Sequence, residues 1–148
     1  MAIVIGANYG YTALVAAGIA LQCLVTSMKV VGARKKYKVD YPDNGSGRYA
    51  AKLSDEDWVA FNNIKRVSDN YLENVGSLLC MLLIAGLFQP KLAASLGGVH
   101  ILGRLLYNIG YVAKGPKGRM MGAPLVGMSY IGLIATVAYN GAMTAIFA

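Results

Sequence analysis

The chain has 148 residues, of which 56% are hydrophobic and 14% charged, and its formal net charge is +7. Soluble domains carry roughly 25% charged residues, so this composition and a mean hydropathy of +0.48 argue against a soluble domain and favour a polytopic membrane protein. The basic residues cluster in two short loops between apolar segments. This arrangement argues against a nucleic-acid-binding surface and is typical of membrane topology.

The first apolar segment runs from Ala2 to Met28 without a charged residue. It is longer than the roughly 20 residues needed to span hydrocarbon, and the basic segment ARKKYK (33–38) ends the span. Because no basic region precedes it, we expect no cleaved signal peptide and a retained first helix. Cys23 here and Cys80 in the next apolar segment are expected to be buried thiols rather than a disulfide pair.

The polar segment 39–53 contains Pro42 and the run NGSG (44–47), which predict a loop. Ser54 is the predicted N-cap of a second helix, with Asp57 at the capping-box position. This helix should begin outside the membrane near residue 55, enter it near residue 72 and end near Phe88, because Pro90 follows. The acidic residues of the region are interpreted as a solvated loop and a helix start: Asp40, Asp43, Asp55, Glu56 and Asp57.

A third apolar segment runs from Leu92 to about Ala113, the second basic loop follows at 114–119, and residues 120–148 are again free of charge. We therefore predict an all-α protein: an integral membrane four-helix bundle, in one domain over residues 1–148. The expected spans are about 8–31, 70–89, 92–113 and 121–147. The positive-inside rule places loops 33–65 and 114–119 on the cytosolic (or matrix) side.

Polar side chains near the membrane form two rows that should converge. At helical spacing Arg66, Asn70 and Glu73 share one face of the second helix. The third helix has a similar row, formed by Arg104, Tyr107 and Tyr111. Helix 1 and the second basic loop add Arg34 and Arg119 at the same corner.

Ionisable groups at a membrane are costly and need a protein or ligand partner. Arginines bind carboxylates by forked hydrogen bonds, and Glu73 and Asn70 suit an ammonium and a peptide group. Glutathione fits such a pocket, and a guanidinium beside its sulfur would lower the pKa of the thiol. No metal-ligand cluster is visible in the sequence.

Each candidate residue also has a purely structural interpretation. Arg66, Asn70 and Glu73 could form an interhelical network, or Arg66 and Glu73 could pair within the fold. Tyr107 and Tyr111 could be aromatic residues of the membrane interface. The basic residues at 34–38 and Arg119 could simply set the membrane topology. His100 could donate a hydrogen bond in the packing of the helices.

Three motifs together resemble the MAPEG family, the membrane-associated proteins of eicosanoid and glutathione metabolism. They are FN-x-x-x-R-x-x-x-N-x-x-E (61–73), ARKKYKV-x-YP (33–42) and GR-x-LY-x-x-GY (103–111). The resemblance covers nearly the whole chain and is greatest to a branch of microsomal glutathione S-transferases. It implies a homotrimer that binds glutathione between subunits and transfers the thiolate to lipophilic electrophiles or reduces lipid hydroperoxides. The expected membrane is that of the endoplasmic reticulum or the mitochondrion.

By motif position, the resemblance assigns glutathione binding to Arg66, Asn70, Glu73, Tyr107 and Tyr111, a contact at the end of the first helix to Arg34, and thiol activation to Arg119. Arg104 is a further candidate glutathione-binding residue, because it belongs to the converging row on the third helix. Several neighbours depart from the family pattern: Asn63, Lys65, Val67, Ser68, Asp69 and Asn74. Lys65 and Asp69 are spaced to pair with each other. The alternatives are a catalytically weakened structural subunit of a larger membrane complex and an adaptor that presents lipid ligands.

Overall fold

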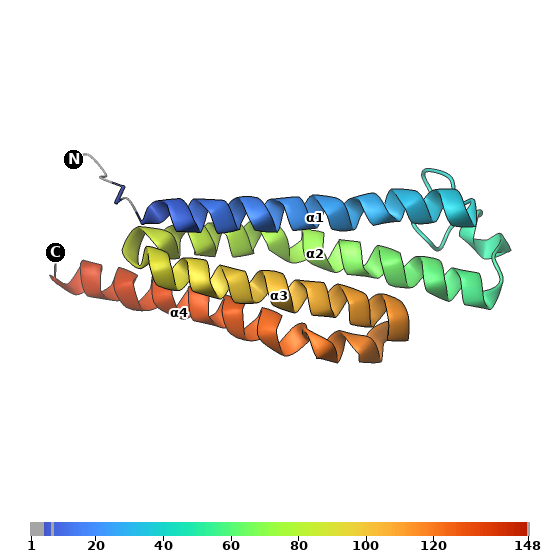
Figure 1. Cartoon of the computed structure of the whole chain (residues 1–148). Coiled ribbons are helices and arrows are strands. Elements are labelled where there is room, and N and C mark those ends of the chain that lie inside the picture. Colours follow the sequence, from blue (N-terminus) through green and yellow to red (C-terminus); the bar gives the residue numbers. More distant parts are fainter. Residues whose placement is uncertain (1–4, 7, 148) are drawn as a thin grey trace.

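The computed structural model describes residues 5–6 and 8–147. Its long helices are α1 (Tyr9–Tyr37), α2 (Asp55–Phe88), α3 (Pro90–Lys114) and α4 (Ala123–Phe147), with short 3₁₀ segments η1 (Ala50–Lys52) and η2 (Gly115–Met121) (Figure 1). The described residues contain no strand, so the all-α prediction is confirmed. The outermost residues of the predicted first and last apolar segments, 2–4 and 148, lie outside the described residues.

Local signals in the sequence account for most helix boundaries. The Ser54 hydroxyl accepts a hydrogen bond from the Asp57 backbone N–H at 3.2 Å, so the predicted N-cap of α2 is present. Gln89 alone separates α2 from α3, and Pro90 occupies the first turn of α3, where no N–H is needed. By contrast, α1 continues through the basic segment to Tyr37, because cations in a last turn complement the helix dipole.

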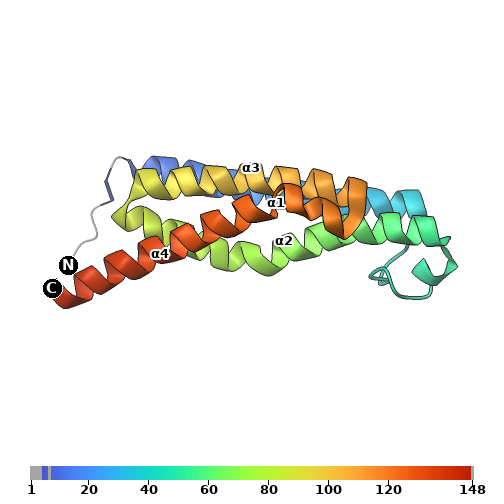
Figure 2. The same ribbon diagram turned by 90° about the horizontal axis from the view of Figure 1, so that it is seen from below.

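The four helices form an elongated bundle (Figures 1 and 2). Helix α1 packs on α2 and α3, and α4 packs on α3 and α2. Both basic connections lie at one end of the bundle. The α2–α3 turn lies at the other end, with the first turn of α1 and the last turn of α4 (Figure 1). At the basic end α1 and α2 extend past the α3–α4 turn and carry the loop 38–54 between them (Figure 1).

Three of the helices, α1, α2 and α4, are long and apolar enough to cross a membrane. Helix α3 is more polar, but the polar residues of its middle part face the interior: His100, Arg104 and Asn108 are all buried. Its exposed face carries large apolar side chains such as Leu102 and Ile109. This inside-out pattern fits a helix whose outer face meets lipid and whose inner face meets other helices.

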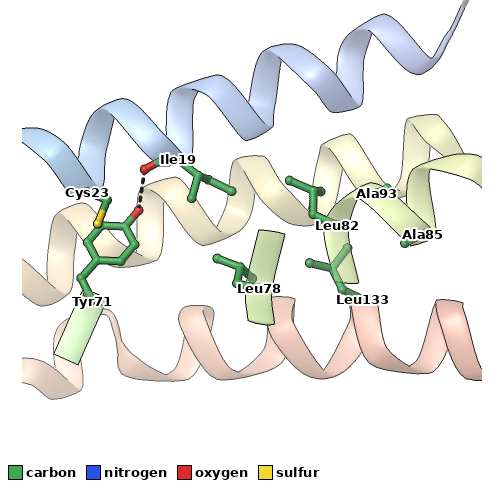
Figure 3. Close-up of a cluster of buried hydrophobic side chains, with 8 residues drawn as sticks. All are labelled: Ile19, Cys23, Tyr71, Leu78, Leu82, Ala85, Ala93 and Leu133. Carbon is green, nitrogen blue, oxygen red and sulfur yellow. Dashed lines mark hydrogen bonds between the residues drawn. The ribbon is translucent and has the colours of Figure 1, made fainter. Parts of the chain in front are cut away.

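The main apolar cluster lies between the helices, away from the loops. Ile19 of α1, Leu78 and Leu82 of α2, and Leu133 of α4 are fully or almost fully buried there (Figure 3). Cys23 belongs to this cluster, whereas Cys80 is exposed on α2. The expectation of two buried thiols is therefore wrong for Cys80, because its side of α2 is not covered by another helix of this chain.

A second apolar cluster lies at the basic end and fastens the loop to the ends of α1 and α2. It contains Tyr37, Val39 and Phe61, with Ala33 and Ala50. Phe61 is fully buried and meets the Tyr37 ring edge-on, with 6.2 Å between ring centroids. The loop is therefore packed against the helices by side-chain burial and is not a free linker.

Asp43 organises the loop from inside. Its carboxylate accepts four backbone N–H hydrogen bonds, each of 2.8 Å, from Gly45, Gly47, Tyr49 and Ala50. The side chain is only 6% exposed, so the interpretation of Asp43 as a solvated acid is wrong. Pro42 and Gly45, which has a φ of 98°, let the chain curl around the carboxylate.

We expect Asp43→Asn to loosen the loop 40–52, because a neutral amide accepts fewer and weaker hydrogen bonds than a carboxylate. The backbone donors, Ala50 foremost, lower the pKa of Asp43 from 3.8 to about 2 against the opposing effect of burial. Because the folded loop favours the charged form, this stabilisation is complete above pH 4 and disappears as pH falls through about 2. Faster hydrogen exchange of the four amides in the variant would show it.

Asp40→Asn is the matched control, since Asp40 is exposed and its side chain makes no hydrogen bond to the described residues. Equal amide protection in both variants would contradict the role given to Asp43.

Candidate active site

A cavity of about 250 Å³ lies between α2, α3 and α4. Its apolar wall includes Val75, Leu78 and Val126. Its polar lining comes from all three helices: Asn70, Tyr71 and Asn74 of α2, His100, Arg104 and Tyr107 of α3, and Tyr130 of α4. The volume falls just below the roughly 300–1,000 Å³ of most small-molecule sites.

Arg104 is the charged group of the cavity and is only 2% exposed. Its Nη1 donates to Asn70 Oδ1 at 2.8 Å, and its Nη2 donates to the Val67 carbonyl at 3.3 Å. The guanidinium carbon lies 4.1 Å from the Tyr71 ring centroid and 4.7 Å from that of Tyr107. Cation–π attraction to two rings therefore holds the guanidinium in place.

The positive charge of Arg104 lacks a counter-ion within the described residues. No carboxylate lies within ion-pair distance of it, and its Nε is buried without a hydrogen-bond partner. A buried charge that is not paired costs several kcal/mol, and neutral amide and carbonyl partners offset only part of that cost. The arrangement therefore suits an anionic ligand that enters the cavity and completes the hydrogen bonding of the guanidinium.

The three predicted residues of α2, Arg66, Asn70 and Glu73, do not all point the same way. Arg66 and Glu73 form an ion pair of 3.0 Å, and their side chains are 53% and 52% exposed. Asn70, between them, turns toward Arg104. The intrahelical pair was one of the structural alternatives, and the structure contains it. Because both groups are half exposed, the pair remains open to a ligand or a second subunit.

Further polar side chains follow the Arg66–Glu73 pair along α2, toward its C-terminal end. Asn74 Nδ2 donates to the Asn70 carbonyl at 2.8 Å, and Ser77 Oγ donates to the Asn74 carbonyl at 3.1 Å. From Arg66 to Ser77 the exposed polar side of α2 extends about 16 Å at 1.5 Å per residue. This polar side lies on a helix that is otherwise apolar enough to cross a membrane.

The two tyrosines of the third-helix row lie together. Tyr107 and Tyr111 stack with 5.7 Å between ring centroids, and both are buried with Val67 of α2. Tyr107 lines the cavity, whereas Tyr111 supports it from the side nearer the basic end. The structure therefore gathers Asn70, Arg104, Tyr107 and Tyr111 into one site.

Arg34 is not part of this site in the single chain. Its Nη1 donates to the Val39 carbonyl at 3.1 Å, its Nη2 donates to Asn44 Oδ1 at 3.4 Å, and its guanidinium lies over the Tyr41 ring. The side chain is 8% exposed. Arg34 therefore stabilises the loop, because the loop folds back over the end of α1 and supplies hydrogen-bond acceptors to the guanidinium.

Arg119 lies in η2, is exposed, and makes no side-chain hydrogen bond or ion pair with the described residues. The turn that carries it is held tightly, because the Gly118 backbone contacts that of Gly110 and Gly122 meets the Gly103 carbonyl. A side chain at any of these glycines would strike backbone atoms. The position of Arg119 is thus fixed by close glycine contacts between α3 and η2.

Four further polar residues of the lining were not among the predicted site residues: Tyr71, Asn74, His100 and Tyr130. Helical spacing could have indicated two of them, because Asn74 lies four residues after Asn70 and His100 lies four before Arg104. The expected packing bond of His100 is confirmed, with 3.2 Å between His100 Nδ1 and Ser129 Oγ of α4.

Comparisons with known proteins agree with the motifs. The MAPEG family model matches residues 12–142. The chain is also similar to an uncharacterized protein of the cyanobacterium Synechocystis, with 34% identity over 125 residues. That match covers 84% of this chain and 82% of the relative.

Proposed function

This chain belongs to the MAPEG family of membrane proteins, and on that premise we propose that it is a glutathione transferase or glutathione peroxidase. Its substrates would be lipophilic electrophiles or lipid hydroperoxides, as in the branch of microsomal glutathione S-transferase 3 that its motifs resemble. The observation that carries the proposal is Arg104, a buried cation with a free Nε that lines a cavity without a carboxylate partner among the described residues.

Glutathione supplies a nucleophilic sulfur and two carboxylates, and the site offers matching groups. Arg104 binds a carboxylate or the thiolate, and Asn70 binds a peptide group beside it. At the exposed side of α2, Arg66 and Glu73 exchange their mutual ion pair for a carboxylate and the ammonium of the ligand. Tyr107 and Tyr111 form the aromatic wall.

The site is proposed to be completed in a homotrimer. Within one chain Arg34 and Arg119 lie outside the cavity lining, and the cavity is small for a tripeptide. The exposed polar side of α2 supports the proposal, because polar groups in a membrane span face other helices or a ligand rather than lipid. A second subunit on this side would supply the missing arginines.

A structural subunit of a larger membrane complex is the second candidate. The observation that favours it is the use of altered motif positions for packing within the chain. Ser68 Oγ donates to Ser27 Oγ of α1 at 3.3 Å, and Lys65 pairs with Asp69 at 2.6 Å. Fixed-stoichiometry co-purification with other membrane proteins, without glutathione binding, would favour this candidate over the enzyme.

Arg119→Ala is expected to lower turnover about 10²- to 10³-fold and leave glutathione affinity nearly unchanged. The reason is that a guanidinium beside the sulfur acts mainly on the thiolate and on the transition state. Conjugation of a lipophilic electrophile by the purified protein, together with calorimetric binding of glutathione, measures both quantities. Lys117→Ala is the matched control, because Lys117 is an exposed cation of the same turn. Wild-type turnover in the Arg119 variant would remove Arg119 from the mechanism.

A further inference from the structure

The cavity lining also contains an imidazole, His100, one helical turn from Arg104. His100 lines the cavity and is only 3% exposed. Tyr71 of α2 lies on one side of it, with 6.4 Å between the ring centroids, and Ser129 of α4 lies on another. Three helices therefore fix the imidazole beside the buried cation.

The hydrogen bonds around Ser129 determine which nitrogen of His100 carries the proton. Ser129 Oγ donates to the Val126 carbonyl at 2.9 Å, so the hydroxyl hydrogen is already used. With the hydroxyl hydrogen directed at the Val126 carbonyl, the Ser129 oxygen accepts from His100 Nδ1, which lies 3.2 Å away. In this neutral tautomer Nδ1 carries the hydrogen and Nε2 carries the lone pair.

Nε2 belongs to a residue that lines the cavity. It makes no hydrogen bond to the described residues. Among the described residues, the fully buried polar side-chain atoms without a hydrogen-bond partner are Arg104 Nε and Asn108 Oδ1. His100 Nε2 is not one of them, so it is not fully buried. A basic nitrogen that is neither bonded nor sealed, in a residue that lines a cavity, is available to a ligand.

The three helices around the cavity bring charged or titratable groups near His100. Arg104 from α3 is the charged group beside it. The other titratable groups that line the cavity are Tyr71 from α2, Tyr107 from α3 and Tyr130 from α4. No carboxylate of the described residues lines this cavity. An anion formed next to Arg104 is stabilised by its positive charge.

We propose that His100 Nε2 is the base that takes the proton from the thiol of glutathione. The inference rests on the proposed function and names the residue that forms the nucleophile. A thiol is activated either by a neighbouring base or by a positive charge. Here His100 provides the base, and the guanidinium groups of Arg104 and of the proposed Arg119 provide the charge.

The step balances without a further reactant when the co-substrate is a conjugated enal. The S–H bond breaks and its proton moves to Nε2. The sulfur electron pair forms a C–S bond to the β-carbon, and the π electrons shift toward the carbonyl. The imidazolium then returns the proton to the α-carbon, and His100 is again neutral.

The test uses His100→Asn in the full-length protein, because the Asn amide can still donate to Ser129 and so preserves the contact between α3 and α4. We expect wild-type glutathione affinity, a turnover about 10²- to 10⁴-fold lower, and loss of the acidic limb of the pH–rate profile. The ultraviolet absorbance of bound thiolate should also require higher pH than in the wild type. Ser95→Ala, an exposed position on α3, is the control for handling and stability.

The outcomes separate the two proposals. If the variant keeps wild-type turnover and the acidic limb, His100 has only its packing role and the inference is overturned, while the proposed function stands. If the wild-type protein binds no glutathione, the proposed function and this inference are both overturned. Loss of turnover with an unchanged pH profile and unchanged thiolate absorbance also overturns it, since a purely structural effect would do the same.

Discussion

Arg104→Met is expected to weaken glutathione binding by about 10- to 100-fold while the protein remains folded. Hydrogen bonds to a charged group contribute about 1.5–3 kcal/mol each when a partner is removed, which corresponds to this range. Met has a similar length and no charge, and replacing a buried charge by an apolar group is often neutral for stability. Calorimetry with glutathione and thermal unfolding in detergent measure the two effects separately.

Arg48→Met is the control for the loss of one cation, because Arg48 lies in the exposed loop, away from the cavity. The central claim about the site fails if Arg104→Met binds glutathione as tightly as the wild type. A variant that does not fold would show instead that the contacts of Arg104 with Asn70 and the two tyrosine rings are required for assembly of the bundle.

Gly110→Ala is expected to destabilise the protein by about 1–3 kcal/mol or more and to lower turnover as strongly as loss of Arg119. A methyl group at Gly110 would strike the Gly118 carbonyl, and backbone atoms cannot move aside as a flexible side chain can. The η2 turn would therefore move away from α3 and carry Arg119 with it. Thermal unfolding and glutathione conjugation measure the two consequences.

Gly98→Ala is the matched control on the same helix, since a methyl group there meets no atom within 4 Å. Alanine is favoured over glycine in a helix by up to about 1 kcal/mol, so this control should be as stable as the wild type or more so. Equal behaviour of the two variants would mean that the contact between α3 and η2 does not position the turn.

The helices could be predicted from the sequence because their limits are set by local signals. Charge-free runs, Ser54 and Pro90 act within a few residues of where they stand, and the observed boundaries of α2 and α3 follow them. The exception is α1, which continues past its last apolar turn. A hydropathy pattern indicates where a helix leaves the lipid. It does not indicate where the helix ends, and α1 continues past the apolar segment.

The site was predicted less completely, because it depends on helix rotation and on loop packing. Spacing placed Arg66, Asn70 and Glu73 on one face, yet that face is wide enough for Asn70 to reach Arg104 while the other two face outward. Spacing could not predict that the loop would offer acceptors to Arg34. Spacing does place His100 on the same face of α3 as Arg104, but it could not predict that Ser129 of α4 would meet His100 there.

The inside-out character of α3 has a consequence for how the protein is made. An isolated arginine at the centre of an inserting helix costs about 2.5–3.5 kcal/mol, and α3 also contains His100 and Asn108. Gln89 alone joins α3 to α2, whose Asn70 and Val67 carbonyl accept hydrogen bonds from Arg104. Helices α2 and α3 are therefore suited to enter the bilayer together as one hairpin. In such a hairpin, α2 supplies hydrogen-bond acceptors to the charge of α3 during biosynthesis.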